Sequence, residues 1–363
     1  MKMLRAVFLL FFVCGSLYAE DFFIIRQDRF FRTEPVLQYW SMNGGDHFSE
    51  LSSPFFLYMP FGYYLGLNVQ TSPAMVNGNT LEKLSGMTDV QLGLSYHLER
   101  YNTVVNVGVN IPSGKKELTS AQFQTSHLAS LYQFDLRTPN FGQGLNLSGG
   151  LTWARPFGSS FVFGLGAAYQ VRGSYKPIQG MLFDYDPGDE ILLTSGFDVK
   201  MDETSSFTFD FIFTSYGTDL IGDDKAFASG KKIVLNFKYE QYFGYNELLV
   251  FARYRSKDKN QIAIAGQLFQ EEEKSIPNQL ELWGLYKHRF SPELRLGFLL
   301  EGRHIAESTA FTSTDIFGAG LLPEYQFSSA VRGLGHLKAL LAQTEKGHDL
   351  FGFEIGAGME VKF

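Results

Sequence analysis

The sequence predicts an all-β protein, a transmembrane antiparallel β-barrel of about fourteen strands (twelve to sixteen are possible) with a short N-terminal plug. The first of three observations is the C-terminal segment 351–363, in which apolar side chains alternate with small or charged ones. Because a strand places alternate side chains on opposite faces, one face here is apolar throughout. A terminal Phe that closes such a strand resembles the assembly signal of bacterial outer-membrane barrels. The residues of this predicted signal are Phe351, Phe353, Ile355, Met359, Val361 and Phe363.

The second observation is an export signal at the N-terminus. Residues 1–19 begin with basic side chains, continue with an apolar core at 6–13, and end in small residues before a predicted cleavage site after Ala19. The core is shorter than the ~20 residues that a membrane-spanning helix needs. The only cysteine, Cys14, lies in this segment, so the mature chain is predicted to contain no thiol and no disulfide.

The third observation is the composition. The chain contains 36 Phe, 18 Tyr and 37 Gly but only 12 Pro, and its mean hydropathy is −0.07. Beyond the export signal no apolar run approaches the length of a spanning helix, and only a helix or a closed sheet satisfies the backbone in lipid. A polar lumen and an apolar exterior would give the near-zero average.

Alternating segments along the rest of the chain define the predicted strands. Their connections alternate between short and long, as in a barrel with periplasmic turns and extracellular loops, which predicts an even strand number and two periplasmic termini. The predicted domains are a signal peptide (1–19), an N-terminal plug or cap (20–55) and a barrel (56–363). The predicted strands fall near 56–70, 87–98, 103–111, 144–155, 160–172, 191–201, 206–216, 231–243, 247–257, 278–290, 293–305, 313–327, 329–343 and 349–363.

Charged side chains fall on the face opposite the apolar one, and we expect them to line the lumen. A Lys or Arg on the lipid face would cost about 2–4 kcal/mol near the midplane, which favours this placement. Because both signs occur, the set is either a lattice of internal ion pairs or the lining of a water-filled pore. The predicted lumen-lining residues are Asp198, Lys200, Asp210, Lys238, Glu240, Arg253, Arg255, Glu281, Arg295, Glu301 and Arg303.

The segment 20–55 precedes the first predicted strand and is rich in apolar side chains, among them Phe30 and Trp40. This much apolar surface should pack and not remain in water. We therefore expect a plug that folds into the lumen. An additional strand or a periplasmic cap is the alternative.

Residues 87–169 resemble FadL-type outer-membrane channels for hydrophobic compounds. They are more similar to the related group that is associated with the meta-pathway of phenol degradation. The matching segments are M-T-D-V-Q-L-G-L-S-Y-H-L (87–98), V-N-V-G-V-N-I-P-S-G (105–114), G-L-N-L-S-G-G-L-T-W (144–153) and G-L-G-A-A-Y (164–169). The group has Gly-Asp where this chain has Thr88–Asp89, and the Asn-Pro-Ala start of FadL proteins is absent after Ala19. The resemblance implies fourteen strands, an N-terminal plug and passive uptake of small hydrophobic or aromatic molecules.

Two long connections, 112–143 and 173–190, carry apolar side chains in a position where loops meet water. We expect these side chains to form an external groove that binds a small hydrophobic ligand. The alternative is that the two loops pack on each other and close the barrel mouth. The predicted substrate-binding residues are Phe123, Leu128, Leu131, Phe134, Met181, Leu182 and Phe183.

No pattern in the chain predicts catalysis, a cofactor or a metal. Ser126, His127 and Ser130 are close in sequence, but adjacency does not make a triad. The seven histidines are scattered without ligand spacing on one element. The expected function is a channel for passive uptake of small hydrophobic or aromatic compounds. A general porin or a structural barrel without transport is the alternative, and a barrel hydrolase is a remote one.

The expected location is the outer membrane of a diderm (Gram-negative) bacterium. The expected partners are outer-membrane lipid and lipopolysaccharide, the barrel assembly machinery through the C-terminal strand, and a small hydrophobic ligand. The net charge of −7 is modest and no basic cluster indicates a nucleic-acid partner.

Overall fold

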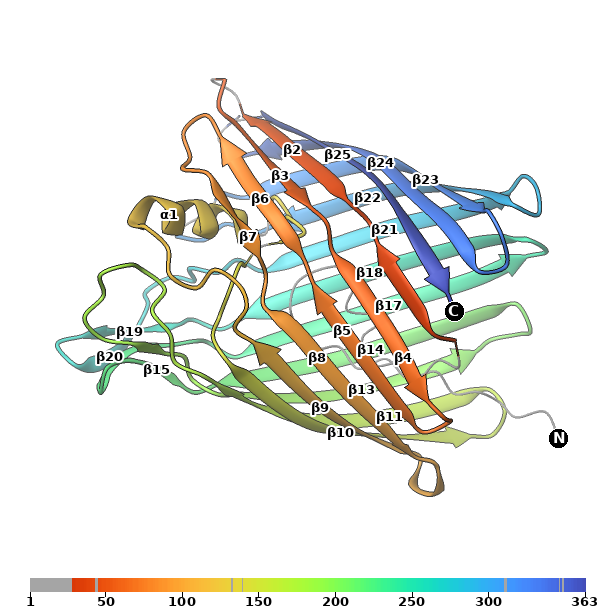
Figure 1. The fold of residues 1–363 in the computed structure, drawn as a ribbon, viewed down its shortest axis with the longest axis horizontal. Helices are drawn as coiled ribbons and strands as arrows, with labels where there is room; N and C mark the ends of the chain where they lie inside the picture. Colours follow the sequence, from red (N-terminus) through yellow and green to blue (C-terminus); the bar gives the residue numbers. More distant parts are fainter. Residues whose placement is uncertain are drawn as a thin grey trace.

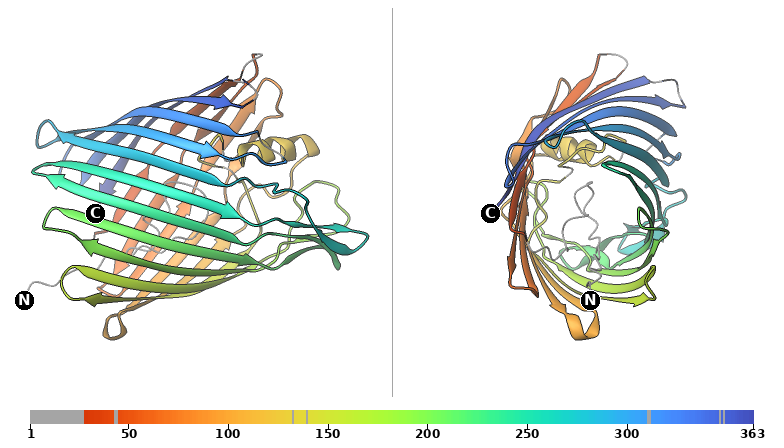
Figure 2. Two further views of the ribbon diagram at one scale, coloured as in Figure 1. Left: turned by 180° about the vertical axis from the view of Figure 1, so that it is seen from behind. Right: turned by 90° about the vertical axis from the view of Figure 1, so that its right-hand side faces the viewer.

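Alternation of apolar and polar side chains gives each strand one face for lipid and one for a lumen, and the strands close into a barrel (Figures 1 and 2). In this computed structural model the described residues are 28–42, 45–131, 133–138, 140–309, 312–345, 347 and 349–363. The predicted signal peptide and residues 20–27 lie outside them. Within the described residues the sheet has 20 strands, but four pairs of short strands run end to end, so that sixteen strand positions surround the barrel.

The four composite strands come first in the chain. They are β1 (Phe30–Thr33) with β2 (Val36–Met42), β3 (His47–Ser52) with β4 (Phe55–Phe61), β5 (Leu65–Thr71) with β6 (Pro73–Gly78), and β7 (Leu84–Met87) with β8 (Val90–Leu98). Twelve continuous strands follow. They are β9 (Thr103–Ile111), β10 (Asn146–Phe157), β11 (Phe161–Arg172), β13 (Glu190–Lys200), β14 (Ser205–Tyr216), β17 (Lys232–Phe243), β18 (Asn246–Lys257), β21 (Gln279–Arg289), β22 (Leu294–Ile305), β23 (Thr314–Gln326), β24 (Val331–Thr344) and β25 (Asp349–Lys362).

The barrel closes through β25, which pairs antiparallel with β24 on one side and with β1 and β2 on the other. The short turns lie at the end of the barrel where the described chain begins and ends, and the long loops lie at the opposite end (Figure 2). Since outer-membrane barrels have short periplasmic turns and longer extracellular loops, the termini mark the periplasmic end.

The long loops carry secondary structure of their own. Five short strands form a second sheet at the loop end of the barrel, namely β12 (Tyr185–Asp186), β15 (Thr218–Ile221), β16 (Asp224–Ala228), β19 (Gln261–Ile264) and β20 (Gln267–Gln270). The helix α1 (Ser120–Ala129) lies in the connection between β9 and β10, and a 3-10 turn, η2 (Glu99–Tyr101), joins β8 to β9. Within the described residues, no helix has the length and apolarity required to span a lipid bilayer.

The predicted antiparallel all-β barrel with an even number of strands is confirmed, but the count of fourteen was wrong. Residues 56–70, predicted as one strand, form the hairpin β4–β5, whose turn begins at Gly62 in a left-handed conformation (φ +69°). The described part of the predicted plug, from Phe30 to Ser52, forms β1, β2 and β3 of the barrel wall. These two changes raise the strand number to sixteen, and the described part of the N-terminal segment forms no plug.

Prolines interrupt the composite strands without changing their register. Pro35 and Pro54 have no N–H to donate to the ladder, so regular pairing stops at both. The chain nevertheless continues in line, because Glu34 N donates to the Pro54 carbonyl (3.3 Å) and Ser53 N donates to the Pro73 carbonyl (2.9 Å). The wall therefore keeps backbone hydrogen bonds across each break.

The fourth composite strand is interrupted by a β-bulge. Gln70 pairs with Gln91 across β5 and β8, whereas Pro73 pairs with Met87 across β6 and β7, which is a shift of one residue. Asp89 lies at this shift and is buried. A bulge redirects a side chain out of the regular alternation, and the Asp89 carboxylate is used in the site described below.

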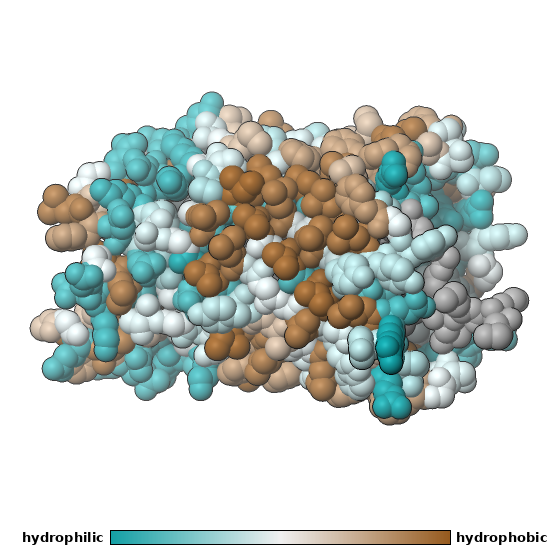
Figure 3. All heavy atoms as spheres, turned by 60° about the horizontal axis from the view of Figure 1, so that its bottom comes forward, coloured by the Kyte–Doolittle hydropathy of each residue, from teal (hydrophilic) through white to brown (hydrophobic). Residues whose placement is uncertain are grey.

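The outer surface carries a band of apolar side chains (Figure 3). Leu300 of β22 is 68% exposed, whereas Arg303 three residues later is 9% exposed because it points inward. In the predicted assembly signal, Phe351, Ile355 and Met359 are exposed, and Glu354 between them is buried. The predicted separation of a lipid face from a lumen face therefore holds along these strands.

Candidate functional site

The connection between β9 and β10, residues 112–145, folds back into the barrel, and we call it the inner loop. Viewed along the barrel axis, α1 lies within the ring of strands (Figure 2, right). Phe134 is 1% exposed, and its ring meets Phe48 edge-on at 4.5 Å and Trp40 at 5.5 Å. Since Trp40 and Phe48 point inward from β2 and β3, the inner loop occupies part of the lumen.

An apolar cluster supports this placement. Side chains of the inner loop pack with inward-facing side chains from β2, β3, β6, β7 and β22–β25. Burying such side chains contributes about 25 cal/mol per Å² of apolar area, so the loop is held by a core and not only by its ends. The members are Trp40, Phe48, Ala74, Val76, Leu84, Leu118, Ala129, Phe134, Leu136, Phe141, Ile305, Ile316, Leu340, Ala342 and Leu350.

Buried polar side chains of the wall bind the backbone of the inner loop. Gln38 donates from Nε2 to the Asp135 carbonyl (3.1 Å) and accepts at Oε1 from Arg137 N (2.7 Å). Glu50 accepts at Oε1 from Thr138 N (2.9 Å). Gln38 and Glu50 are both 0% exposed. A non-repetitive segment buried in a barrel must satisfy its backbone groups, and these contacts do so.

Ion pairs join the inner loop to the opposite end of the chain. Asp135 lies 3.6 Å from Arg303 of β22, and Arg137 lies 3.7 Å from Glu354 of β25. Glu354 also accepts from Lys338 Nζ at 2.8 Å, and Lys338 lies 3.3 Å from Glu301. Acids and bases alternate through this network, so each buried charge has a counter-charge.

Asp89 binds both ends of the inner loop. One carboxylate oxygen accepts from Gly114 N (2.9 Å), and the other accepts from Gln143 N (2.8 Å) and Asn110 Nδ2 (2.9 Å). A Cβ on Gly114 would lie 1.9 Å from the Phe141 carbonyl oxygen. The bulge at Asp89 and the glycine at 114 are therefore the base on which the loop turns inward.

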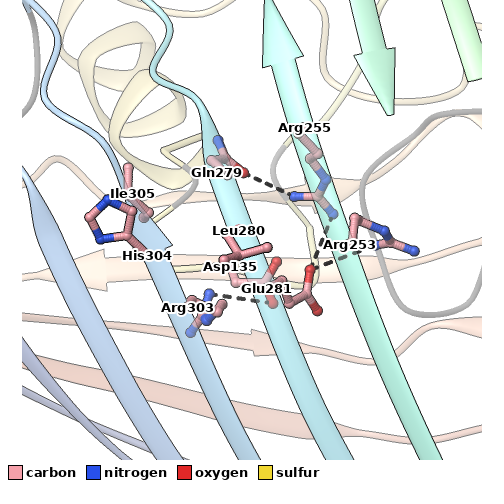
Figure 4. A pocket seen from close by; sticks show the side chains of 9 residues that line it. All are labelled: Asp135, Arg253, Arg255, Gln279, Leu280, Glu281, Arg303, His304 and Ile305. Carbon is pink, nitrogen blue, oxygen red and sulfur yellow. Dashed lines mark hydrogen bonds and ion pairs between the residues drawn. The ribbon is translucent and has the colours of Figure 1, made fainter. Parts of the chain in front are cut away.

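A pocket lies beside the inner loop, between Asp135 and the inner faces of β18, β21 and β22 (Figure 4). Arg253 and Arg255 of β18 both face Glu281 of β21, at 3.8 and 3.7 Å. Arg303 of β22 faces Asp135 across the pocket. The pocket thus brings cationic side chains of the wall against an acidic residue of the inner loop.

The predicted lumen-lining residues fall into two groups. Arg253, Arg255, Glu281, Glu301 and Arg303 lie around the inner loop, in or next to the pocket. The others lie elsewhere on the inner faces. Lys238 pairs with Glu240 (3.3 Å), Asp198 accepts from Thr208 (2.6 Å), Asp210 lies opposite Gly196 and Asn236, and Lys200 and Arg295 are exposed near the periplasmic turns.

The seven predicted substrate-binding residues lie in two different connections, the inner loop and the connection between β11 and β13. Phe134 is in the core beneath the inner loop, and Leu128 and Leu131 pack against that core. Leu182 and Phe183 are 87% and 60% exposed in the connection between β11 and β13, which also contains Met181, and Phe123 is 41% exposed on α1. The two connections do meet, through a parallel bridge between Leu118 and Ile178. The seven residues do not line a single groove.

The sequence reasoning missed Gln38 and Glu50, which bind the inner loop, and the buried His336 and Lys338, which pair with Glu354. His336 lies 2.7 Å from Glu34, and both are buried. The detectable sign was a charged or amide side chain at alternate positions of an apolar strand, as Glu354 and Glu360 already show in the last strand. Within the described ranges, no group of three or more His, Cys, Asp or Glu side chains is placed to hold a metal ion.

No family model matches the chain and no curated protein matches it, so membership of the FadL-type channels is not shown. Solved structures match it distantly. A Pseudomonas aeruginosa structure named OpdL is 10% identical, with a TM-score of 0.47, covering 93% of this chain and 99% of its own. An anion-selective porin from Comamonas acidovorans is 12% identical, with a TM-score of 0.45, covering 92% and 98%. A mutant of the Rh. blastica porin is 10% identical, with a TM-score of 0.40, covering 92% and 99%.

These likenesses are too distant to carry a functional argument, and the geometry of the chain itself has to do so. A closed sixteen-position barrel with an apolar outer band and an inward-folded loop is a porin-like barrel. The geometry accordingly identifies a transmembrane β-barrel, which agrees with the predicted location in a bacterial outer membrane.

Proposed function

We propose that the protein is a passive diffusion channel for small organic solutes, and that the inner loop sets the width and lining of its narrowest part. The observation that carries this proposal is the attachment of the inner loop within the lumen, by Gln38, Glu50 and the Asp135–Arg303 ion pair. A structural barrel needs only a packed interior. A loop that presents charged side chains toward a pocket on the facing wall supports a role in selecting solutes.

Uptake of hydrophobic or aromatic compounds is the finer part of this proposal. An arc of apolar side chains, formed by Ala168, Leu192, Ile212 and Val234 on β11, β13, β14 and β17, supports it. The arc belongs to the inner faces of these strands, because it alternates with outward residues such as Ile191 and Phe237. An apolar solute could move along this arc while the charged side chains stay hydrated.

The proposed partners follow from the same architecture. The exposed band of Phe351, Ile355 and Met359 would contact lipid, and the C-terminal strand would be recognised by the barrel assembly machinery. Lipopolysaccharide would face the loop end. Each of these is a proposal, and the assembly role is tested by a charged substitution at Phe363, which should reduce insertion of the barrel without altering conductance of the inserted fraction.

The decisive experiment compares single-channel conductance in planar bilayers for the full protein and for a variant in which residues 116–140 are replaced by a short Gly-Ser linker. We expect the loop-deleted barrel to conduct severalfold more than the full protein, because the loop occupies lumen. Removal of residues 28–55 would be uninformative, since they form barrel strands.

Two outcomes would contradict the proposal. If both proteins refold, as judged by their strand content, and neither conducts ions or passes small organic solutes into liposomes, the barrel is structural. If both conduct equally, the inner loop does not set the constriction.

A further inference from the structure

We propose that the wall beside the inner loop holds a binding site for small organic anions that have an apolar body. Arg255 and Arg303 would bind the anionic group, and the apolar arc that begins at Val234 would contact the body. This inference rests on the proposed channel function and names the class of solute for it.

The charge of the pocket is the first support. Its lining contains three arginines, Arg253, Arg255 and Arg303, but only two carboxylates, Asp135 and Glu281 (Figure 4). Glu301 lies 3.6 Å from Arg303 and balances the third arginine, so the pocket is close to neutral, whereas the chain as a whole carries a formal charge of −7. A solute anion would therefore be repelled less here than at the protein surface in general.

The second support is the length of the contacts between the pocket arginines and Glu281. Arg253 and Arg255 share one oxygen of Glu281 at 3.8 and 3.7 Å, distances too long for hydrogen bonds. By contrast, Lys338 is hydrogen-bonded to Glu354 at 2.8 Å in the network that holds the loop. The Arg255 guanidinium, which donates one hydrogen bond from Nη1 to Gln279 (3.2 Å), therefore keeps donors for a carboxylate, which arginine binds through two parallel hydrogen bonds.

Arg303 provides a third and independent observation. Its side chain is 8% exposed, and it lines the pocket. Its Nε is buried and donates no hydrogen bond, and its contacts with Asp135 and Glu301 are both 3.6 Å long. A buried donor without an acceptor costs about 1–3 kcal/mol, and an anion in the pocket would supply the acceptor.

The apolar arc adjoins the arginines through the register of the strands. Val234 lies directly opposite Arg255 on the neighbouring strand, and Ile212 lies directly opposite Val234. On the next pair of strands Leu192 lies opposite Ala168. Directly opposite residues of antiparallel strands have Cβ atoms about 4.5–5.5 Å apart. A planar ring could therefore lie on Val234 and Ile212 while its carboxylate reaches Arg255.

The test uses the full protein in planar bilayers, with benzoate as the probe and three comparisons: acetate, benzyl alcohol and benzylammonium. We expect benzoate to reduce the ion current at lower concentration than any of the three, because only benzoate has both the charge and the ring. Equal effects of acetate and benzoate would overturn the role of the apolar arc. Equal effects of benzyl alcohol and benzoate would overturn the role of the arginines.

A matched pair of variants localises the site. We expect Arg255→Gln to weaken benzoate binding about tenfold, the loss expected for one charge-assisted hydrogen bond, and Arg255→Lys to weaken it less. Arg295→Gln removes the same charge from the inner face of β22 near the periplasmic turns and should leave benzoate binding within about twofold. An equal loss in both glutamine variants would mean that benzoate senses only the general potential of the lumen, which would overturn the site.

Failure of this inference is distinguishable from failure of the proposed function. Benzoate binding to the detergent-solubilised wild type, measured by calorimetry, requires neither conductance nor a variant. A barrel that conducts but does not bind benzoate overturns the anion site alone. A barrel that binds benzoate with the expected preference over benzyl alcohol, but conducts nothing, supports the site and overturns the channel.

Discussion

Two parts of the barrel wall differ in how their inner faces are built. The loop-bearing wall, formed by β1–β8 and β22–β25, has fully buried polar side chains such as Gln38 and Glu50, and its first four strand positions are interrupted. The opposite wall, formed by β10, β11, β13, β14, β17, β18 and β21, has uninterrupted strands and half-buried ion pairs such as Lys238–Glu240. The first resembles the interior of a globular domain and the second resembles a water-lined surface. Holding a loop in the lumen therefore changes what a strand sequence must contain.

The largest effect should come from breaking the buried network of the loop-bearing wall. Glu354→Gln would remove the buried negative charge that lies 2.8 Å from Lys338 and 3.7 Å from Arg137, so that these two cations share fewer counter-charges. Since removal of one member of a buried ion pair costs about 3–5 kcal/mol, we expect a drop of that size in the free energy of unfolding by urea. Glu281→Gln on the opposite wall is the control and should cost at most about 1 kcal/mol. Equal losses of unfolding free energy in the two variants would show that ion pairs contribute equally to stability in both walls.

A second test concerns the base of the inner loop. Gly114→Ala places a Cβ 1.9 Å from the Phe141 carbonyl oxygen and 2.9 Å from Asp89 N, so the loop end must shift. We expect a loss of about 1–3 kcal/mol in unfolding free energy, as for overpacked interiors, and faster proteolysis within residues 112–145. Gly149→Ala on β10 is the matched control, because its Cβ would meet no atom within 4 Å. If Gly114→Ala left the free energy of unfolding unchanged, the loop end could adopt another conformation in the lumen.

A third test sharpens the role of the bulge. Asp89→Asn replaces one acceptor oxygen by an amide nitrogen and so loses at least one hydrogen bond to the loop ends. We expect a cost of about 1.5 kcal/mol, the lower end for bonds to a charged group, with larger fluctuations of the single-channel current. Asp198→Asn on the opposite wall keeps one acceptor for Thr208 and should not change the fluctuations. If the current fluctuations of the Asp89→Asn variant equalled those of the wild type, Asp89 would not hold the base of the inner loop.

The smallest effect should appear at a periplasmic turn that touches neither wall's interior. The backbone N–H of Thr204, together with Ser205 and the Thr204 hydroxyl, lowers the pKa of Asp202 from 3.8 to about 2. A lowered pKa in the folded state gives stability that is present above the unfolded pKa and is lost as the pH falls through about 2. Thermal midpoints measured between about pH 5 and pH 2 should fall slightly more for the wild type than for Asp202→Ala. Parallel curves would contradict this assignment.

The same contrast between the walls explains how much could be predicted from the sequence. On the opposite wall, alternation alone located every barrel strand from Asn146 to Arg289 to within a few residues, because each of these strands separates lipid from water, whereas the five short strands of the loop sheet were not predicted. On the loop-bearing wall, inward positions such as Trp40, Phe48 and Val76 are apolar because they pack against the loop. Both faces of these N-terminal strands are then apolar, and periodicity no longer identifies them, whereas β22–β25 of the same wall keep the alternation and were located from the sequence.

Prolines and an unusual turn sequence also made the N-terminal strands difficult to recognise in the sequence. Pro35 and Pro54 interrupt the first two composite strands, and the hairpin turn after Phe61 carries exposed tyrosines in place of the usual Asn or Asp. The motif around Asp89 and Gly114 was visible in the sequence, but its role depends on a contact across 25 residues and on Gln143, 54 residues away. Single-sequence reasoning therefore found the charged lining of the pocket but not the inner loop that makes it a site.

The seam between β25 and the first strands has a consequence for the kinetics of assembly. Lys362 and Asp28 lie 3.0 Å apart but are 334 residues apart in the chain, so this seam joins the most distant parts of the described polypeptide. Loop-closure entropy grows with chain length and slows the formation of distant contacts more than it weakens them. Until the seam forms, two strand edges are open to pairing with another chain. Substitutions along β1 or β25 that delay closure should thus raise aggregation during biogenesis even where the closed barrel is as stable as before.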